Sequence, residues 1–391
     1  MGAPVLVLPE AEGLIFWIEN SIEWVAANEE KIVDLSIRSR WRNPYFSPQW
    51  LRSWWKRLEG HKTPVLLVVK DRYGMLVGFW PFVERPGLLY SKGLWPFIFD
   101  EANYFHPLAE TCCIPLLVQG LKSLLQKYIF VWIPLMRNPF WKNFLEPKIA
   151  HQKQPYIARA PRSTSMVNVD SGEFNEFWSK KLGTKSQKSF RYDQGALAKQ
   201  GDVKFEFWEK FEDVRAMMPS TCLVEVESKK SKDGAGLFSV RGKRGFFFEL
   251  FPELAKLGQI RLSFLRLNDE PIAWQINLLD KDYLAVHHLS YNEKWKKFSP
   301  GRQLLHANMK LAWDEQRVID FLPLTFAYKE KLATENEKIN ELHWFKRSLR
   351  GWIAYRLIKW NMRIRKKIHY QGSSKSKGSE ALRKALSGEM V

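Results

Sequence analysis

Cysteine is scarce in this chain of 391 residues, and its scarcity excludes a disulfide scaffold. The three cysteines are Cys112, Cys113 and Cys222, and two of them are adjacent, so no framework of pairs can be drawn. A Cys-x-x-Cys pair is also missing, as is a cluster of Cys and His at the spacing of zinc ligands. We therefore expect reduced thiols and a cytosolic environment.

Long hydrophobic runs are missing as well. The longest apolar run, Ile129–Met136, contains Pro134 and is closed by Arg137, and it is far shorter than the roughly 20 residues of a membrane-spanning helix. The N-terminal stretch has no basic start and carries four glutamates among its apolar residues, which is not the pattern of a secretory signal. We expect the protein to lie on the cytoplasmic side of any membrane.

Several common catalytic motifs are absent too. The sequence shows no serine-triad motif, no Walker-type phosphate loop and no Gly-x-Gly-x-x-Gly after a strand. Hydrophobic residues nevertheless make up 45% of the chain, which is enough to build sizeable cores and excludes wholesale disorder.

Positive charge is concentrated at the C-terminal end. The chain has 61 Lys and Arg against 42 Asp and Glu, a formal net charge of +19. Residues 346–391 hold thirteen of the basic and two of the acidic residues, a net charge of +11, which leaves +8 for the preceding 345 residues. Nine of these basic residues lie between Lys346 and Tyr370 with no acidic residue among them. The high pI is therefore largely a property of one tail.

Apolar residues in this tail recur at helical spacing, and the stripe has three interpretations. Its members are Leu349, Trp352, Ile353, Leu357, Trp360 and Ile364. The helix could lie on an anionic membrane surface, bind nucleic-acid phosphates with its tryptophans stacked on bases, or pack its stripe on the protein. Of the two ligands we favour the membrane. From Gln371 onward the Ser, Gly and Lys content predicts a disordered end.

Helical and strand patterns alternate along the chain and predict a mixed α/β fold in two halves. In the second half we expect strands over residues 260–267, 272–279 and 283–290, then a helix over 301–316 and a strand over 318–322. The polar stretch His151–Pro161 is the candidate boundary. We therefore predict an N-terminal module over 1–155, a C-terminal module over 156–345 and a basic helical tail over 346–391.

The start of the expected long helix is the candidate cofactor site. Ser299, Pro300, Gly301, Arg302 and Gln303 open this helix, and a helix N-terminus offers free N–H groups and a positive dipole end to phosphate oxygens. Further cations precede the helix, and Trp295 or Phe298 could cover an adenine ring; the cations are Lys294, Lys296 and Lys297. A cofactor with a pyrophosphate group fits this pattern, although Ser-Pro-Gly is also an ordinary N-cap and turn.

The same region carries a resemblance to a known family. Four short motifs resemble, in their order and spacing, those of the bacterial acetyltransferase family named for cellulose-biosynthesis proteins (CelD/BcsL-like). They are Ser290-Tyr291-Asn292, Ser299-Pro300-Gly301, Asp320-Phe321-Leu322 and Tyr328-Lys329. That family belongs to the N-acetyltransferase (GNAT) superfamily and is similar to the Fem peptidyltransferases. The resemblance covers roughly residues 30 to 332. Pro323-Leu324 stands where the family has a glycine.

The resemblance implies two tandem GNAT-like modules with mixed sheets and flanking helices, and acyl-CoA as the donor, bound by Tyr291 and the residues that open the helix. It also implies a role in polysaccharide or cell-envelope synthesis, with an anionic or sugar-containing acceptor. In such enzymes backbone N–H groups at a splayed strand polarise the thioester carbonyl. Here the strands expected over 272–279 and 283–290 are the candidates.

Acyl transfer also needs groups that move protons. His287 and His288 are neighbours on one strand, so strand alternation predicts that at most one faces the cleft. Asp320 is a second candidate base, and Tyr328 could protonate the leaving sulfur. Lys329 could orient Asp320 or a substrate anion. Glu225 and Glu227 are weaker candidates.

The helix around Arg191 is basic on more than one face and could form an electropositive wall for an anionic acceptor. Its cations are Lys180, Lys181, Lys185, Lys188 and Arg191. Three functions stay open: an acyl-CoA-dependent N- or O-acyltransferase, a Fem-like transferase that uses aminoacyl-tRNA, and an inactive scaffold on a membrane surface. We expect the first.

Overall fold

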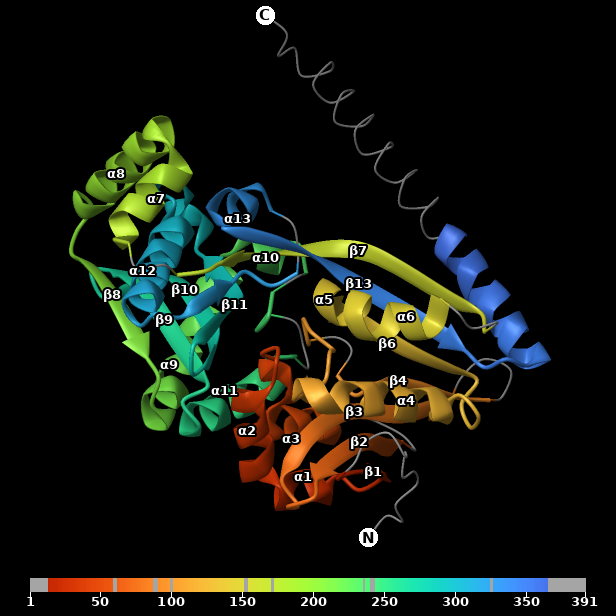
Figure 1. Cartoon of the computed structure of the whole chain (residues 1–391). Helices are drawn as coiled ribbons and strands as arrows, with labels where there is room; N and C mark the ends of the chain where they lie inside the picture. Colours follow the sequence, from red (N-terminus) through yellow and green to blue (C-terminus); the bar gives the residue numbers. More distant parts are fainter. Residues whose placement is uncertain are drawn as a thin grey trace, which may run out of the picture.

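The computed structural model describes residues 13–58, 62–86, 91–98, 101–150, 154–169, 172–234, 236–239, 243–323 and 326–364. Its centre is one continuous sheet of thirteen strands, with helices on both faces (Figure 1). The strand order along the sheet is β1-β2-β3-β4-β6-β13-β7-β12-β11-β10-β9-β8, with the short β5 paired to β3. The mixed α/β fold expected from the sequence is confirmed.

The first half of the chain forms one end of this sheet. Its strands are β1 (Leu14–Glu19), β2 (Thr63–Asp71), β3 (Leu76–Pro86), β4 (Lys92–Pro96), β5 (Leu108–Ala109) and β6 (Phe130–Arg137). Its helices are α1 (Glu23–Ala27), α2 (Glu29–Arg38), α3 (Pro48–Arg57), α4 (Ile114–Leu124), α5 (Asn138–Phe140) and α6 (Glu146–Ala150). The hairpin between β2 and β3 forms as predicted, because the Asp71 carboxylate accepts the N–H groups of Tyr73 and Met75.

The second half forms the other end. Its strands are β7 (Tyr156–Val167), β8 (Val203–Trp208), β9 (Ile260–Leu267), β10 (Glu270–Asp280), β11 (Tyr283–Tyr291), β12 (Val318–Asp320) and β13 (Glu335–Phe345). Its helices are α7 (Phe174–Leu182), α8 (Thr184–Ala198), α9 (Phe211–Val226), α10 (Lys229–Lys232), α11 (Lys243–Lys256), α12 (Pro300–Asp314) and α13 (Ala327–Leu332).

The two halves of the sheet meet at β13, which lies between β6 and β7. In each half the last two strands of the local sheet are parallel: β4 with β6, and β11 with β12. The next strands in the chain join the halves: β7 pairs with β12, while β13 of the second half pairs with β6 of the first half and with β7. Part of the stretch expected to be a linker is therefore the start of β7. Neither half completes its sheet alone, and the division at residue 155 stays a proposal.

Adjacent residues of β10 show how the helices of the second half are layered. Asn277 hydrogen-bonds Asn308 of α12 on one face, whereas the preceding Ile276 packs into the large core that also contains Phe247 and Phe251 of α11. Side chains of a strand alternate between faces, so α12 covers one face of the sheet and α11 the other.

The basic tail begins as the helix predicted for it, over residues 349–364 (the C-terminal helix). Ala354, Tyr355 and Ile358 dock it on Phe345 of β13 and Phe130 of β6. The disordered end expected from Gln371 lies outside the described residues. Among the helices that are described, none combines the length and apolar character needed to cross a membrane.

Candidate active site

The candidate site lies where β11 and β12 part. These parallel strands are paired over three positions only, from Tyr283 opposite Val318 to Ala285 opposite Asp320. β12 ends there, whereas β11 continues to Tyr291. In the described part of the chain, the last six residues of β11 therefore have no strand partner on this side. An unpaired strand edge presents backbone N–H and C=O groups that an extended ligand can bind.

A β-bulge places both histidines of β11 on one face of the sheet. The pairing of β10 with β11 skips a residue, because Ile276 lies opposite His288 and Asn277 opposite Val286. His287 is the extra residue. Its ring contacts Phe247 and Phe251 of α11, while the ring of His288 stacks on Trp274 on the same face. The expectation that only one histidine can face this side is wrong, since a bulge interrupts strand alternation.

Burial lowers the proton affinity of both histidines. It lowers the pKa of His287 to about 3, and the nearby Lys230 ammonium adds to this effect. The pKa of His288 is also lowered well below its usual range, first by burial and then by Lys230. Both rings are therefore neutral at pH 7. Groups with such low pKa values are poorly matched to general-base catalysis at neutral pH and serve better as neutral hydrogen-bond partners.

Lys230 of α10 is a site residue that the sequence analysis did not identify. Its ammonium donates to the carbonyl oxygen of Leu289 at 2.7 Å and lies 3.3 Å from Nε2 of His288. Burial lowers the pKa of Lys230 to about 8. A cation thus stands directly at the open edge of β11. No sequence motif marks it, because Lys230 lies in a run of lysines that resembles a solvated surface.

The N-terminus of α12 follows this edge, after the short 3₁₀ helix Glu293–Phe298. Ser299 has φ of 51° and ψ of 48°, a left-handed conformation that is uncommon for a residue other than glycine. Gly301 lies against the side chains of Leu289 and Tyr291, where a Cβ atom would come within 2.9 Å of Leu289 Cδ2. Among the described residues, no carbonyl accepts the N–H of Gly301. The helix start therefore touches the open strand and retains a free donor.

The other residues predicted here have structural contacts. Arg302 donates to the carbonyl of Ser186 and lies over the ring of Phe190, both in α8. Gln303 is buried and donates to the carbonyl of Phe298. Arg302 therefore ties α12 to α8, which also carries Arg191.

Helix α8 brings exposed cations close to the start of α12. Lys185, Lys188 and Arg191 of this helix are exposed. The contact of Arg302 with Ser186 and Phe190 places their helix beside the candidate site. This arrangement agrees with the expected electropositive wall, and the role of Arg191 in binding a substrate stays a prediction.

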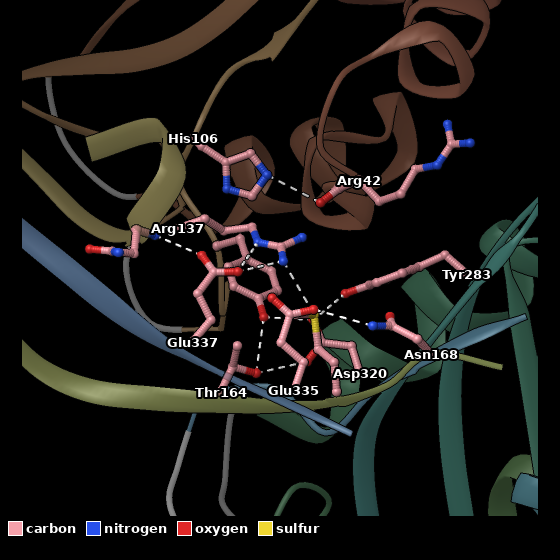
Figure 2. Close-up of polar contacts among 12 residues, drawn as sticks. Arg42, His106, Arg137, Thr164, Asn168, Tyr283, Asp320, Glu335 and Glu337 are labelled. Carbon is pink, nitrogen blue, oxygen red and sulfur yellow. Dashed lines mark hydrogen bonds and ion pairs between the residues drawn. The ribbon is translucent and has the colours of Figure 1, made fainter. Parts of the chain in front are cut away.

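Asp320 is the centre of a buried polar cluster rather than an open base (Figure 2). Its carboxylate accepts hydrogen bonds from the hydroxyls of Tyr104 at 2.6 Å, Tyr283 at 2.7 Å and Thr164 at 2.8 Å. Burial, followed by the Asp320 charge, raises the pKa of both tyrosines well above its usual range. The cluster joins three strands of the second half, β7, β11 and β12, to the segment of the first half that contains Tyr104. The carboxylate has no contact with the open edge of β11 among its described hydrogen bonds.

Asp320 and Lys329 together hold one strained turn. Leu322 has a positive φ of 60°, which is rare for a bulky residue, and its N–H donates to Asp320 at 2.7 Å. The Lys329 ammonium donates to the carbonyls of Phe321 at 2.6 Å and Leu322 at 3.4 Å. The expected contact of Lys329 with the Asp320 carboxylate is not among these bonds. Burial lowers the pKa of Lys329 to about 8.

The remaining candidates divide between exposed and structural residues. Tyr328 is 48% exposed, and its ring stacks on Phe326. Glu225 is fully buried and accepts three N–H groups of the segment Leu237–Ser239, so it shapes that segment. It is thereby removed from the candidate bases.

Two further features lie apart from this site. A surface hollow of about 730 Å³ is lined mainly by α1 and α2, away from β11. Among the described residues, no three His, Cys, Asp or Glu side chains converge as metal ligands would.

Comparison with solved structures identifies the fold. FemX superposes with a TM-score of 0.59 and 12% identity over 84% of this chain and 98% of that chain. A conserved protein of unknown function from Bacteroides thetaiotaomicron VPI-5482 superposes with a TM-score of 0.53 and 11% identity, over 85% of this chain and 100% of that chain. The C-terminal domain of a protein described as a lysylphosphatidylglycerol synthetase from Agrobacterium fabrum superposes with a TM-score of 0.52 and 12% identity, over 82% of this chain and 92% of that chain. At these identities the similarity shows a shared fold alone.

Comparison of sequences identifies part of the chain. A search of curated protein sequences gives no match. A family model described as an acetyltransferase (GNAT) domain matches residues 184–330. The narrower resemblance to the cellulose-biosynthesis family stays a prediction. Residues 184–330 therefore resemble a GNAT acetyltransferase domain, and this stretch includes both the splayed strand β11 and the start of α12.

Proposed function

We propose that the protein transfers an acyl group from acyl-CoA to an amine or hydroxyl of a cell-envelope or polysaccharide-related acceptor. The observation that carries this proposal is the parting of β11 from β12 directly before the start of α12. An acyl-CoA molecule combines an amide-bearing arm with a pyrophosphate. The unpaired edge suits the arm, and the helix start suits the pyrophosphate.

The proposed reaction joins the acceptor to the acyl carbon. The acceptor nitrogen or oxygen attacks the thioester carbonyl, the carbon–sulfur bond breaks, and the acceptor loses a proton while the thiolate gains one. Backbone N–H groups at the open edge of β11 would stabilise the oxyanion. Tyr328, whose hydroxyl has its pKa raised to about 12 by burial and so keeps its proton at neutral pH, is our candidate for protonating the sulfur. Neutral His287 and His288, with Lys230, would position the reacting groups.

The cationic wall on α8 supports an anionic acceptor, such as a sugar phosphate. It also fits the alternative donor, aminoacyl-tRNA, whose phosphates would contact Lys185, Lys188 and Arg191. Because the acceptor class belongs to the envelope, we propose that the protein works at the cytoplasmic face of the membrane. These features make the donor the first point to test.

Calorimetric titration with acetyl-CoA, a long-chain acyl-CoA and CoA tests the proposal directly. We expect saturable binding of at least one thioester, lost in Gly301→Val and retained in Leu223→Ser, a variant at an exposed leucine of α9. Absence of binding to every acyl-CoA by the folded protein would overturn the proposal. If charged tRNA binds instead, with a steep salt dependence that Lys185→Gln and Lys188→Gln reduce, the aminoacyl-tRNA alternative replaces it.

A further inference from the structure

The C-terminal helix has two apolar faces, and the protein covers one of them. Ala354, Tyr355 and Ile358 pack on Phe345 and its neighbours. Of the six residues of the predicted stripe, Ile364 is partly buried, whereas the other five point elsewhere and remain in solvent. Their exposed fractions are 78% for Leu349, 44% for Trp352, 39% for Ile353, 39% for Leu357 and 63% for Trp360. The interpretation that the stripe packs on the protein is therefore wrong.

Helical geometry explains how one helix presents both faces. At about 100° per residue, Leu349, Ile353 and Trp360 lie within about 40° of one another. Ile358 lies about 180° from Leu349, on the docked side. The exposed residues thus form one outward stripe, and the docking contacts fix its direction relative to the molecule.

Cations flank the outward stripe. On the same count Arg356, Arg363 and Lys359 lie on one side of Leu349, Ile353 and Trp360, close to Trp352, and Arg350 lies on the other side, next to Leu357. No acidic residue interrupts residues 346–370. Apolar and aromatic side chains between rows of Lys and Arg are typical of helices that lie in the interface of an anionic bilayer.

We propose that this outward stripe docks the protein on an anionic lipid bilayer, with the helix parallel to the surface. Leu349, Ile353 and Trp360 enter the boundary between headgroups and acyl chains, and the flanking cations contact lipid phosphates and carboxylates. Leucine and isoleucine gain nothing from a nucleic acid, which offers no apolar phase. A second copy of the helix would bring like charges together. An anionic bilayer offers an apolar phase to the stripe and negative charge to the cations.

Docking at this helix leaves the candidate active site free. In Figure 1 the C-terminal helix and α12 lie at opposite ends of the molecule. The bilayer therefore holds the protein without covering β11 or α12, so acyl-CoA can enter from solution. This inference does not depend on the transferase proposal, because lipid binding is measured without a donor.

Sedimentation with sucrose-loaded vesicles tests the proposal. The full chain is mixed with phosphatidylcholine vesicles that contain about 30% phosphatidylserine, and with vesicles of phosphatidylcholine alone. We expect binding to the anionic vesicles at least tenfold tighter, and weaker as salt rises. Each cation near the surface contributes about fivefold, so the triple change Arg356→Gln, Lys359→Gln and Arg363→Gln should weaken binding by about 100-fold.

The apolar stripe has its own test. Leu349→Ser with Trp360→Ser should weaken vesicle binding at least tenfold, whereas the control Leu223→Ser, at a leucine that is 67% exposed in α9, should not. Unchanged circular dichroism and thermal midpoint show that each variant is folded. Vesicle binding that survives both the charge and the stripe variants would overturn the proposal. So would stripe variants that weaken binding to a single-stranded oligonucleotide and leave vesicle binding unchanged.

Discussion

Replacement of Asp320 by asparagine should destabilise the protein more than it impairs any chemical step. The side chain is fully buried and accepts four hydrogen bonds, from three hydroxyls and the N–H of Leu322. Asparagine keeps the shape of the side chain, removes its charge and replaces one acceptor oxygen by an NH2 group, which cannot accept the two hydrogen bonds that this oxygen receives. The perturbation therefore tests whether the carboxylate is structural, as its contacts indicate, or a catalytic base, as the sequence suggested.

The expected magnitude follows from the four bonds. Hydrogen bonds to a charged group are roughly twice as strong as neutral ones, a difference of about 1 kcal/mol per bond. Two bonds weakened by about 1 kcal/mol each and two bonds lost at about 1.5–3 kcal/mol each predict a loss of at least about 5 kcal/mol in the free energy of unfolding. Tyr104→Phe and Tyr283→Phe each remove one bond and should lose about 1.5–3 kcal/mol.

Urea unfolding at 25 °C, followed by tryptophan fluorescence, measures these losses. The midpoint should fall in all three variants while the slope stays constant. Tyr192→Phe is the matched control, since that tyrosine is 76% exposed and its change should stay within about 0.5 kcal/mol. In the double variant Tyr283→Phe with Asp320→Asn, the two losses should not add, because both disturb the same bond.

One result would refute this reasoning. If Asp320→Asn unfolds within about 1 kcal/mol of the parent protein but acyl transfer falls by about 100-fold or more, the carboxylate acts in the chemistry and the cluster does not stabilise the fold. A large loss of stability, with acyl-CoA binding retained by the folded fraction, supports the structural role.

Three further changes give sharp outcomes. Because burial lowers the pKa of Lys230 to about 8, its positive charge is lost as the pH rises through 8. The Kd for acyl-CoA, measured by calorimetry, should therefore rise between pH 7 and 9. In Lys230→Met the Kd should be higher than in the parent protein at pH 7 and independent of pH. Gly301→Val places carbon atoms against Leu289 and should weaken acyl-CoA binding at least tenfold, with a thermal midpoint that changes little. Gly351→Ala sets a Cβ atom against the carbonyl of Lys346 and should release the C-terminal helix, so that limited proteolysis cleaves near residue 350 while the remainder stays resistant.

Local patterns predicted most of the second half correctly. The strands β9, β10 and β11 and the helix α12 each follow from spacing and turn residues within the segment itself. The strand β12 is shorter than expected, since it ends at Asp320 rather than at Leu322. The two residues by which β12 is shorter lie in the strained turn, beyond the last pairing of β12 with β11.

The strand β13, which joins the second half to the first, escaped prediction because its polar residues are satisfied by distant partners. β13 contains buried Glu337 and Glu341, which in isolation do not indicate a central strand. Glu337 pairs with Arg137 of β6, and Glu341 pairs with Arg159 of β7 at 2.7 Å. Buried charges are tolerated when they are paired. Arg137 and Glu337 are 200 residues apart in the sequence. No local signal contains this information.

The candidate site shows a different limit of sequence reasoning. The start of α12 was identified from its composition, whereas the bulge at His287 and the position of Lys230 depend on how two segments meet in space. Strand alternation gave the wrong orientation for one histidine, because the bulge has no residue signature here. Titratable groups that approach from another element, such as Lys230, need the tertiary structure.

The spacing of Asp320 and Lys329 illustrates why a motif does not by itself identify a catalytic group. Asp320 holds the N–H of Leu322, and Lys329 holds the carbonyls of Phe321 and Leu322. Both side chains thus bond the backbone of a turn in which the bulky Leu322 has a positive φ. The turn ends β12 and so determines where β11 loses its partner. The motif thus supports the chemistry by shaping the open strand edge, and the proton transfers must be sought among the groups that face that edge.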